Sequence, residues 1–531
     1  MSFLIYISYL VILFFIGRGN IILLNFSLKN KVPVDSAKIF NINICYFYPV
    51  IGMLSLGNFA FLLNFITPLE QTLLWVLMPL LGLNFLAKLN LQLNRFSACN
   101  IFLVPLPFFA AVSQIGFHYD AGLYHLKYQN YLRSNKIIFG HINLDFSYGF
   151  SSLADYMGAM HWISGNLLLL SFIQIPFFIL FFNVLNIYVF KKSSKKIKNA
   201  SAYLVLYVVL DNFGYKGGVN GTPNIQGIPK YDSISAILVC ICVLFYLEAY
   251  NKTGLSINEK RFLLFFTFAS IQIRPTNMVL LILTMGILLK ITKQEDTINT
   301  FKENLLIITL SFMWILKNII ISSCIFFPVR FLCYDGFLWS DKTVASTTSQ
   351  KITSYFRNTE FEFLYNQRII INFSIFIILI VGVEILRQRS IMIFQNINSW
   401  FYFYLITNVF LFLFMAPTLR FFNGVILSSI LIITYFFKSS SKAKPINSLL
   451  VPMFIFSLLL IPKVSDYRNL ASYDTSRLQI SYPEISYISF DSSKYVIPKN
   501  GEQCWLNIYC IPYEDTITKK YYKYNYIIFV E

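Results

Sequence analysis

Charged residues are scarce in this chain. Of its 531 residues, 13% are Asp, Glu, Lys or Arg and 56% are hydrophobic, whereas a soluble domain carries about 25% charged residues. A water-soluble fold could not bury that much apolar surface. Apolar runs of roughly 15 to 25 residues recur from end to end, and about 20 helical residues cross a bilayer core. The sequence therefore predicts an all-α polytopic membrane protein.

Acidic residues are especially few. The chain has 25 Asp and Glu against 43 Lys and Arg, which gives a net charge of +18. The lysines fall in short loops between apolar runs, where they report membrane orientation and not a ligand. This distribution excludes nucleic acid as a partner and leaves membrane lipids as the surroundings of most of the chain.

Signals of processing and repetition are also missing. No basic residue precedes the apolar run 3–17 and no small-residue cleavage site follows it, so we expect it to remain as a membrane helix. Arg18 comes after the run, which predicts that the N-terminus lies outside. No internal repeat or inverted symmetry is visible. The simplest organisation is one membrane domain, residues 1–462, with a small external C-terminal segment, residues 463–531.

Basic loops set the predicted topology, because short loops rich in Lys and Arg stay on the cytoplasmic side. Five such loops lie at 191–198, 252–261, 290–302, 387–389 and 438–444. With these loops inside, both termini are outside and the sequence predicts about fourteen spans: 3–17, 43–63, 71–88, 97–115, 167–190, 201–212, 233–250, 262–273, 276–290, 305–327, 369–386, 398–416, 424–437 and 448–462.

The remaining segments are external and hold most of the polar variety. Before the C-terminal segment they are 116–166, 213–232 and 329–368. The stretch 262–290 is too short for two full crossings, so we expect a hairpin of short helices with Arg274 and Pro275 at its outer turn. Short helices at membrane depth are tolerated where they are buried in protein or line a cavity. The Gly-rich stretch 217–224 is either a substrate-gating loop or a simple turn.

Histidine is rare and confined to one external segment. The four histidines are His118, His125, His141 and His161. Asp120 and two imidazoles stand where the chain leaves the bilayer, and this group can take a proton from an acceptor hydroxyl. It can also bind a divalent cation such as Mg²⁺ or Mn²⁺, with His118 and Asp120 as ligands. The alternative is that Asp120 only caps an amphipathic helix over 121–133. The four histidines lack the compact spacing of a multi-histidine metal site.

Several runs of the chain form a recognisable set. They are YDAGLYH (119–125), NL (143–144), GFSS (149–152), WILKN (314–318), APTLRF (416–421) and GEQCW (501–505). The set resembles a family of largely uncharacterised bacterial polytopic membrane proteins, whose motifs read YDTGLYH, NLH, GFNSS, W-x-x-R/K-N, APxxRF and GDQCW. Ala121, Asp145 and Ser151 depart from these motifs, whereas Asp120 is kept.

That family in turn is similar to the GT-C class of integral-membrane glycosyltransferases, which use a lipid-phosphate sugar donor and a carboxylate in the first large external loop. The resemblance implies a GT-C-like fold and a catalytic role for Asp120. His125 and Asp155 are further catalytic candidates, and Asp232 is either a helix cap or another acidic group facing the cavity. The matched motifs also supply candidate substrate-binding residues: Tyr124, Asn143 and Ser152.

Two arginines lie at external turns between apolar helices. An interfacial or intramembrane cation is costly and indicates function by default. A polyprenyl phosphate would supply the matching anion for Arg274 and Arg420, because Arg offers a planar fork to phosphate. The alternative is an ordinary arginine that snorkels to the headgroups. Lys317 lies within a predicted span and is either a buried charge partner or a residue close to the substrate cavity.

The eight cysteines divide by location. Five lie in or near apolar spans and are expected to be packing residues: Cys45, Cys99, Cys240, Cys242 and Cys324. Cys504 and Cys510 lie in the external C-terminal segment, where an oxidising compartment favours a disulfide between them. We expect this disulfide to help fold the segment without a part in chemistry. Cys333 is then an unpaired external thiol or buried.

These observations predict a glycosyltransferase of the bacterial inner membrane. It would take a sugar from a polyprenyl-phosphate donor at the outer face and pass it to a glycan or lipid-linked acceptor, in surface polysaccharide or glycoconjugate assembly. An O-antigen or capsule repeat-unit polymerase is the second interpretation. A flippase or transporter without chemistry is the third. A transporter needs ionisable residues at mid-membrane on several helices, whereas here they concentrate in external loops.

Overall fold

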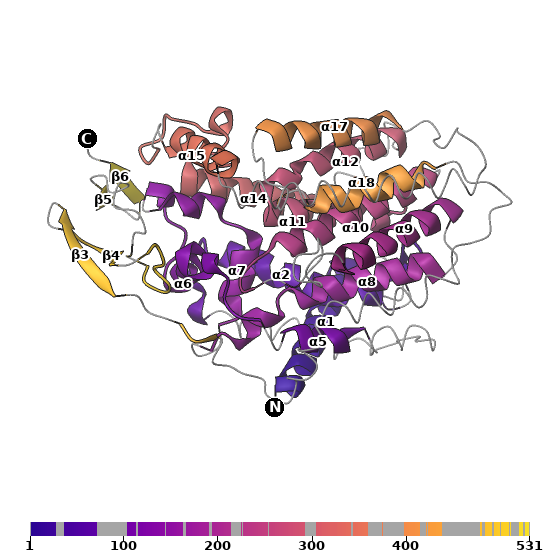
Figure 1. Ribbon diagram of the computed structural model, residues 1–531, viewed down its shortest axis with the longest axis horizontal. Coiled ribbons are helices and arrows are strands. Elements are labelled where there is room, and N and C mark those ends of the chain that lie inside the picture. The colour runs from indigo at the N-terminus through magenta and orange to yellow at the C-terminus, as the bar shows by residue number, and fades with distance from the viewer. Residues whose placement is uncertain are drawn as a thin grey trace.

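The computed structural model describes residues 2–27, 35, 37–71, 104–112, 115–143, 145–162, 166–190, 194–213, 225, 227–252, 254–291, 304–340, 344–358, 374, 398–414, 421, 423–437, 478–480, 484–490, 493–499, 501–508, 510, 520–523 and 526–529. Within these residues the protein is mainly helical, with three two-stranded antiparallel sheets (Figure 1).

Most of the longer helices are built from apolar runs, whereas α15 (Val344–Asn358) consists mainly of polar residues. The longer helices are α1 (Ser2–Ser27), α2 (Tyr48–Leu63), α8 (Ile175–Phe190), α9 (Lys195–Phe213), α10 (Asp232–Asn251), α11 (Ile257–Ile273), α12 (Leu280–Ile291), α14 (Leu305–Ser322), α15, α17 (Ser399–Phe414) and α18 (Asn423–Tyr435). Shorter α-helices are α5 (Pro105–Val112), α6 (Leu126–Ser134) and α7 (Leu153–Met160).

Short tight helices and strands connect these elements. The 3₁₀ turns are η2 (Ile44–Tyr46), η3 (Leu69–Gln71), η5 (His141–Asn143), η6 (Phe146–Phe150), η7 (Leu168–Phe172), η8 (Pro275–Val279) and η9 (Arg330–Leu332), and η4 (Ala121–His125) is a π-helical turn. The sheets pair β1 (Lys38–Ile39) with β2 (Ile42–Asn43), β3 (Ile485–Phe490) with β4 (Ser493–Pro498), and β5 (Lys520–Lys523) with β6 (Tyr526–Phe529).

Several of these helices could cross a membrane. Four described segments are long and apolar enough to do so: Phe3–Leu23, Leu168–Phe190, Asp232–Asn251 and Leu305–Ser322. Shorter apolar helices coincide with further predicted spans: Tyr48–Leu63, Pro275–Leu289, Ser399–Leu411 and Asn423–Tyr435. The coarse prediction of a mainly helical chain is confirmed. The predicted spans 71–88, 369–386 and 448–462 lie wholly or mostly outside the described residues, and within 97–115 the structure describes residues 104–112, with α5, and residue 115.

The core is centred on α10, which packs against α8, α11, α12 and α18. Its residues are buried continuously from Asp232 to Ala249, as expected for a helix that is apolar on every face. In Figure 1, α8, α9, α10 and α18 run alongside one another through the middle of the molecule. This packed group supports the start of α10, which reaches the candidate site.

Helices α1 and α2 approach each other closely at two glycines. A Cβ atom on Gly17 would lie 1.9 Å from the carbonyl oxygen of Tyr48, and one on Gly52 would lie 2.2 Å from the carbonyl oxygen of Leu13. Small residues of this kind allow helix backbones to meet inside membranes, where packing drives association. Any side chain at either position would push the two helices apart.

The first helix differs from the prediction, because α1 continues to Ser27 and encloses Arg18. The Arg18 side chain is buried and its Nε and one Nη each donate to a carboxylate oxygen of Asp35 at 2.9 Å. Tyr48 donates to the same carboxylate at 3.0 Å. Arg18 is therefore a buried ion-pair partner and not a loop residue at a helix end, so its use as an orientation marker was wrong.

The short hairpin predicted over 262–290 is present. Helices α11 and α12 pack together, and the chain turns at Arg274, which is extended, and enters η8 at Pro275. A capping box between Ser256 and Glu259 fixes the start of α11, because each side chain satisfies a backbone N–H of the other. One boundary differs: α9 begins at Lys195, so part of the predicted basic loop is helical.

Two disulfides are formed. Cys504–Cys510 is bonded as predicted. Cys324–Cys333 is also bonded, which corrects the expectation that Cys324 only packs in a span and that Cys333 is unpaired. The helix α14 ends at Ser322, five residues before the predicted end of that span, and Ser323 turns left-handed (φ 59°) to start the bridged loop.

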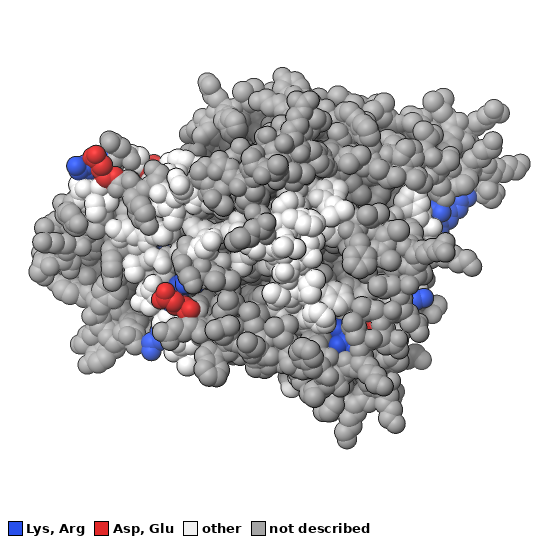
Figure 2. Space-filling view, turned by 90° about the horizontal axis from the view of Figure 1, so that it is seen from below, with Lys and Arg blue, Asp and Glu red and all other residues white. Residues whose placement is uncertain are grey.

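The C-terminal segment adds two further hairpins to a mainly helical chain. These hairpins, β3–β4 and β5–β6, lie at one end of the molecule in Figure 1. Figure 2 views the molecule from below, and on the described part of this face a band of uncharged surface separates charged side chains on its two sides.

Candidate functional site

A cavity of about 420 Å³ opens where the segment 116–166 meets the start of α10, the α11–η8 turn and the loop after α14. The first three regions and α15 supply its polar side chains: Tyr124, His125, Tyr128, Asp145, Ser147, Ser152, Asp155, Lys230, Tyr231, Asp232, Arg274, Thr276 and Ser349. The loop after α14 supplies apolar ones. The structure thus gathers six of the residues singled out from sequence: Tyr124, His125, Ser152, Asp155, Asp232 and Arg274. A mostly apolar pocket with a few convergent polar groups is the usual form of a ligand site.

The centre of the polar lining is a histidine backed by a carboxylate. His125 Nδ1 lies 2.9 Å from Oδ1 of Asp155. Asp155 is held in turn because its other oxygen accepts the backbone N–H of Ser152 at 3.1 Å in a capping box at the start of α7. With its Nδ1 proton donated to the carboxylate, the imidazole has Nε2 as its proton acceptor. The pair has the geometry of an oriented general base.

Aromatic rings fix the histidine from two sides. The Tyr124 ring centroid lies 4.2 Å and the Tyr231 ring centroid 5.3 Å from that of His125. The Tyr231 hydroxyl accepts from Gln129 Nε2 at 2.9 Å, so this ring is itself anchored. His125 ends the π-helical turn η4, and the wider turn precedes the regular helix α6. Such π turns are often found at functional sites.

Asp120 does not cap the helical turn that follows it, which contradicts one of the two interpretations of the sequence. Its side chain makes no capping hydrogen bond, and Lys230 Nζ instead lies 2.5 Å from Oδ2. Burial raises the pKa of the Asp120 carboxyl, but attraction and hydrogen bonding to Lys230, with smaller effects of His118 and His125, lower the pKa below its ordinary value overall. Asp120 is not among the residues that line the cavity. Its link to the cavity lining is the ion pair with Lys230.

An alternating row of charges runs from Asp120 along one wall. Lys230 lies 3.9 Å from Oδ2 of Asp232, and Asp232 is ion-paired and hydrogen-bonded to Arg274. The Arg274 guanidinium also lies 4.7 Å above the ring of Phe421. The arginine and lysine therefore reach the cavity already oriented by carboxylates. Asp232 faces the cavity and is not merely a helix cap.

The donors near Asp120 do not fit a divalent cation. One carboxylate oxygen holds the ammonium of Lys230, and His118 Nδ1 accepts the backbone N–H of Asp120 at 3.1 Å while lying 3.6 Å from its other oxygen. Within the part of the chain that the structure describes, no three His, Cys, Asp or Glu side chains come together as metal ligands would. The mechanism proposed below therefore uses protein groups alone.

The other histidines lie away from the cavity lining. His141 is buried with its ring 3.8 Å from that of Tyr131, and burial lowers its pKa to about 3. His161 is buried beside the Tyr9 hydroxyl, and burial lowers its pKa to about 4. Both are therefore neutral at physiological pH. The clustering of four histidines in one segment reflects one cavity residue and three with other roles.

Lys317 and Asn143 do not line the cavity. Each stabilises the structure around it by hydrogen bonds. Lys317 is fully buried, donates to the carbonyl and the hydroxyl of Ser151 at 3.3 and 3.1 Å, and lies 3.4 Å from the centroid of the Trp314 ring. Asn143 donates to the carbonyl of Trp339 at 2.9 Å. Lys317 is thus buried against a neutral side chain and an aromatic ring, and none of the ion pairs that the structure describes includes it.

A second buried ion pair, Lys127–Asp145, adjoins the cavity. Lys127 is hydrogen-bonded to Asp145, which lines the cavity, and also donates to the carbonyl of Cys510 at 3.1 Å. Burial raises the pKa of the Asp145 carboxyl, but Lys127 and the Ser147 hydrogen bonds lower it overall. Sequence reasoning missed Lys127 and Lys230. The available signal for Lys230 was a lysine two residues before Asp232, at the start of an apolar span.

The C-terminal disulfide loop, Cys504–Cys510, packs against the π-helical turn η4. The Gly122 carbonyl accepts the backbone N–H groups of both Cys504 and Trp505 at 2.8 Å, and Gln503 Nε2 donates to the Tyr119 carbonyl at 2.9 Å. Asn130 of α6 donates to Leu506 at 2.8 Å. The two sequence motifs YDAGLYH and GEQCW, almost 400 residues apart, thus form one structural unit.

Two predicted features lie outside the described residues. They are Arg420 and the Gly-rich stretch 217–224. The residue after Arg420, Phe421, lines the cavity and lies under Arg274.

The sequence was compared with known families, curated proteins and solved structures. Residues 1–427 match the family described as "Domain of unknown function (DUF8201)". The chain belongs to this family. No curated protein and no solved structure matches it. The predicted membership of an uncharacterised family is confirmed, and the similarity of that family to GT-C glycosyltransferases stays a prediction.

Proposed function

We propose that this protein is a glycosyltransferase of GT-C type in the bacterial inner membrane. It transfers a sugar from a polyprenyl-phosphate donor to a glycan or lipid-linked acceptor at the outer face, in surface polysaccharide or glycoconjugate assembly. The observation that carries the proposal is one cavity lined by a carboxylate-backed imidazole, His125–Asp155, and by an oriented arginine, Arg274. Sugar transfer from a phosphate needs these two groups together: a base for the acceptor and a cation for the leaving anion.

In the proposed reaction, His125 Nε2 takes the proton from the acceptor hydroxyl as its oxygen attacks the anomeric carbon of the sugar. The bond from that carbon to the phosphate oxygen breaks, and the electron pair leaves with the polyprenyl phosphate. Arg274 and Lys230 stabilise this anion as its charge develops. Asp155 stabilises the imidazolium that forms, and Asp232 keeps Arg274 in place. No oxidant or other reactant is needed.

Membrane placement completes the proposal. About fourteen spans, with the basic loops inside, leave segment 116–166 and the C-terminal segment outside. Disulfides persist in oxidising compartments, and Cys333, Cys504 and Cys510 all lie in segments that the sequence predicts to be external. The active cavity would therefore open to the outer face, where polyprenyl-phosphate sugars are consumed in this class of reaction.

The test compares two histidines of the same segment. His125→Asn removes the proposed base, and we expect sugar transfer from a polyprenyl-phosphate sugar in proteoliposomes to fall about 100-fold or more, the scale for a positioned base. His118→Asn is the matched control, because His118 lies outside the cavity lining and Asn can still accept the Asp120 N–H. Equal activity of the two variants, at equal abundance, would remove His125 from the mechanism.

A further inference from the structure

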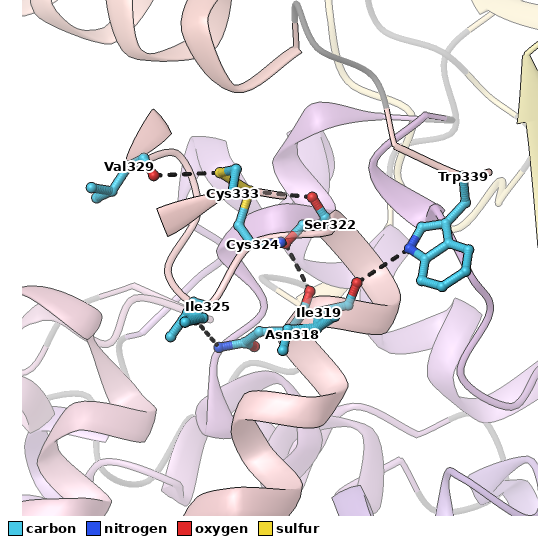
Figure 3. The surroundings of a disulfide bond; sticks show 8 residues. All are labelled: Asn318, Ile319, Ser322, Cys324, Ile325, Val329, Cys333 and Trp339. Atoms are coloured by element: carbon cyan, nitrogen blue, oxygen red, sulfur yellow. Dashed lines mark hydrogen bonds between the residues drawn. A yellow bond between two sulfur atoms is a disulfide. The ribbon is translucent and has the colours of Figure 1, made fainter. Parts of the chain in front are cut away.

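The segment after α14 folds back on itself as a disulfide-closed loop, Cys324 to Cys333, here termed the Cys324–Cys333 loop. Two backbone hydrogen bonds flank the bridge, from Ile325 N–H to Leu332 O at 2.9 Å and from Tyr334 N–H to Ser323 O at 2.8 Å. Figure 3 shows the bridge above the end of α14. The loop is thus closed by covalent and hydrogen bonds at its base.

Side chains of α14 and the following segment hold the loop in place. Asn318 donates its side-chain N–H to the Ile325 carbonyl at 3.0 Å, and the Trp339 indole donates to the Ile319 carbonyl at 3.3 Å (Figure 3). The Trp339 carbonyl accepts from Asn143. The loop is therefore fixed both to the membrane helix and to the segment that carries His125.

The inner side of the loop is a wall of the cavity. Phe326, Phe327, Pro328 and Val329 all line it. Phe327 is 5% exposed, and its ring meets that of Phe150 with centroids 5.2 Å apart. These residues face the space that His125 and Arg274 also line, so an apolar surface lies beside the polar groups of the site.

The outer side of the loop and of the residues just after it is exposed and rich in apolar side chains. Phe331 in the loop is 84% exposed, and Tyr334 and Leu338, which follow the loop, are 62% and 74% exposed. The charged residues Arg330 and Asp335 are exposed beside them. Large apolar side chains gathered on one exposed segment mark an interaction surface. Aromatic residues together with an arginine are typical of the zone where a membrane protein passes through lipid headgroups.

Continuity with α14 indicates that the occupant of this surface is lipid. The loop begins two residues after α14 ends, and α14 is a candidate span with only 22% of its length buried in the protein. Phe312 on this helix is 64% exposed. Half-buried apolar side chains follow the helix through Ile319 and Ile320, and Ile325 in the loop is 36% exposed, so partly exposed apolar surface leads from the candidate span into the loop.

We propose that the Cys324–Cys333 loop is a membrane-seated lip of the cavity, over which the isoprenoid chain of a lipid-phosphate ligand passes from the bilayer to the site. The inference rests on the proposed function for the identity of the ligand. The outer face lies among lipid headgroups and acyl chains, while the inner face offers the isoprenoid chain an apolar surface beside Arg274. A long apolar chain attached to the phosphate can then stay out of water throughout binding.

Photo-crosslinking tests the lip directly. p-Benzoylphenylalanine replaces Phe331 in one variant and Lys499 of the C-terminal segment, whose side chain is 53% exposed, in the control. Both side chains are exposed, so neither replacement disturbs a packed core. The purified proteins are irradiated in liposomes that contain tagged phosphatidylglycerol and a tagged polyprenyl monophosphate. We expect lipid adducts of both tags at position 331 and none above background at position 499.

The outcomes separate the lip from the reaction, because crosslinking requires no sugar transfer. Lipid adducts at position 331 without sugar transfer in any assay would support the lip and count against the glycosyltransferase. Sugar transfer by the wild-type protein with no more adduct at position 331 than at 499 would overturn the lip alone. A protein adduct at position 331 in intact cells, in place of lipid adducts, would also overturn it.

Discussion

At the scale of single residues, the site depends on which carboxylate faces which base or cation. Asp120 was the strongest candidate from sequence, yet it faces Lys230, and Asp155 is the carboxylate that orients His125. Both His125 and Asp155 were candidates, but their pairing joins positions 30 residues apart. Spacing within one helix predicts pairs three or four residues apart; it carries no information on pairs between α6 and α7.

The Asp120–Lys230 pair yields a prediction for a double-mutant cycle. The two side chains are 17% and 10% exposed, so removing one leaves a mostly buried charge without its closest partner. Asp120→Asn and Lys230→Gln, alone and together, should show a coupling free energy of about 1 to 3 kcal/mol, as residues in contact do. The measurement is thermal unfolding of the purified protein. Additive effects of the two substitutions would show that the pair does not form.

The lowered pKa of Asp120 predicts how this contribution depends on pH. A group whose pKa is depressed in the folded state stabilises it fully above its unfolded pKa, about 4 for Asp, and loses that contribution as the pH falls through the lower folded value. The difference in melting temperature between wild type and Asp120→Asn should therefore be constant from about pH 7 to pH 5 and shrink below about pH 4. A difference that grows on acidification would contradict the assignment.

At the scale of elements, the π-helical turn η4 and the C-terminal disulfide loop support one another. Sequence predicted a continuous helix over 121–133, but the chain forms η4 and then α6. At this turn the Gly122 carbonyl accepts hydrogen bonds from the backbone N–H groups of Cys504 and Trp505. Local helix propensity could not predict the wider turn, because its partner comes from the far end of the chain. The disulfide itself was predictable, since its two cysteines are close in sequence.

Gly122→Ala tests whether this contact positions the site. A Cβ atom there would lie 2.8 Å from Cε2 of Trp505, and overpacking of this kind costs roughly 1 to 3 kcal/mol. We expect easier proteolysis of the C-terminal segment and a lower rate of sugar transfer. Gly254→Ala is the control, since nothing lies within 4 Å of a Cβ at that position. The same proteolysis rate in both variants would separate the C-terminal segment from the turn.

At the scale of the whole molecule, the pattern of apolar runs was enough to predict a helical chain with candidate membrane spans. It did not predict where Arg18 lies, because a buried arginine paired with Asp35 looks in sequence like an arginine at a helix end. Hairpin α11–α12 was predictable because parity between basic loops demanded it. The β-hairpins of the C-terminal segment were not predicted.

Cysteine labelling tests the topology. The cysteines at 324, 333, 504 and 510 are in disulfides, and the free cysteines that the structure describes, Cys45, Cys240 and Cys242, are buried. Replacing Cys99 with serine then gives a suitable background. A membrane-impermeant maleimide should label Lys136→Cys in intact cells and Lys195→Cys only after permeabilisation, since both lysines are exposed. The opposite labelling pattern would show that the membrane orientation is the reverse of the predicted one.

The lipid-linked glycan profile of cells tests sugar transfer most directly. Cells that lack the protein are complemented with the wild type or with His125→Asn at equal abundance, and their lipid-linked and surface glycans are compared by mass spectrometry. We predict that the deletion and the His125→Asn strain both lack one sugar residue that the wild type restores. Complete repeat units that accumulate without being joined would indicate a polymerase, and complete lipid-linked glycans held at the inner face would indicate a flippase. Either result, or a normal profile with His125→Asn, would contradict sugar transfer at this cavity.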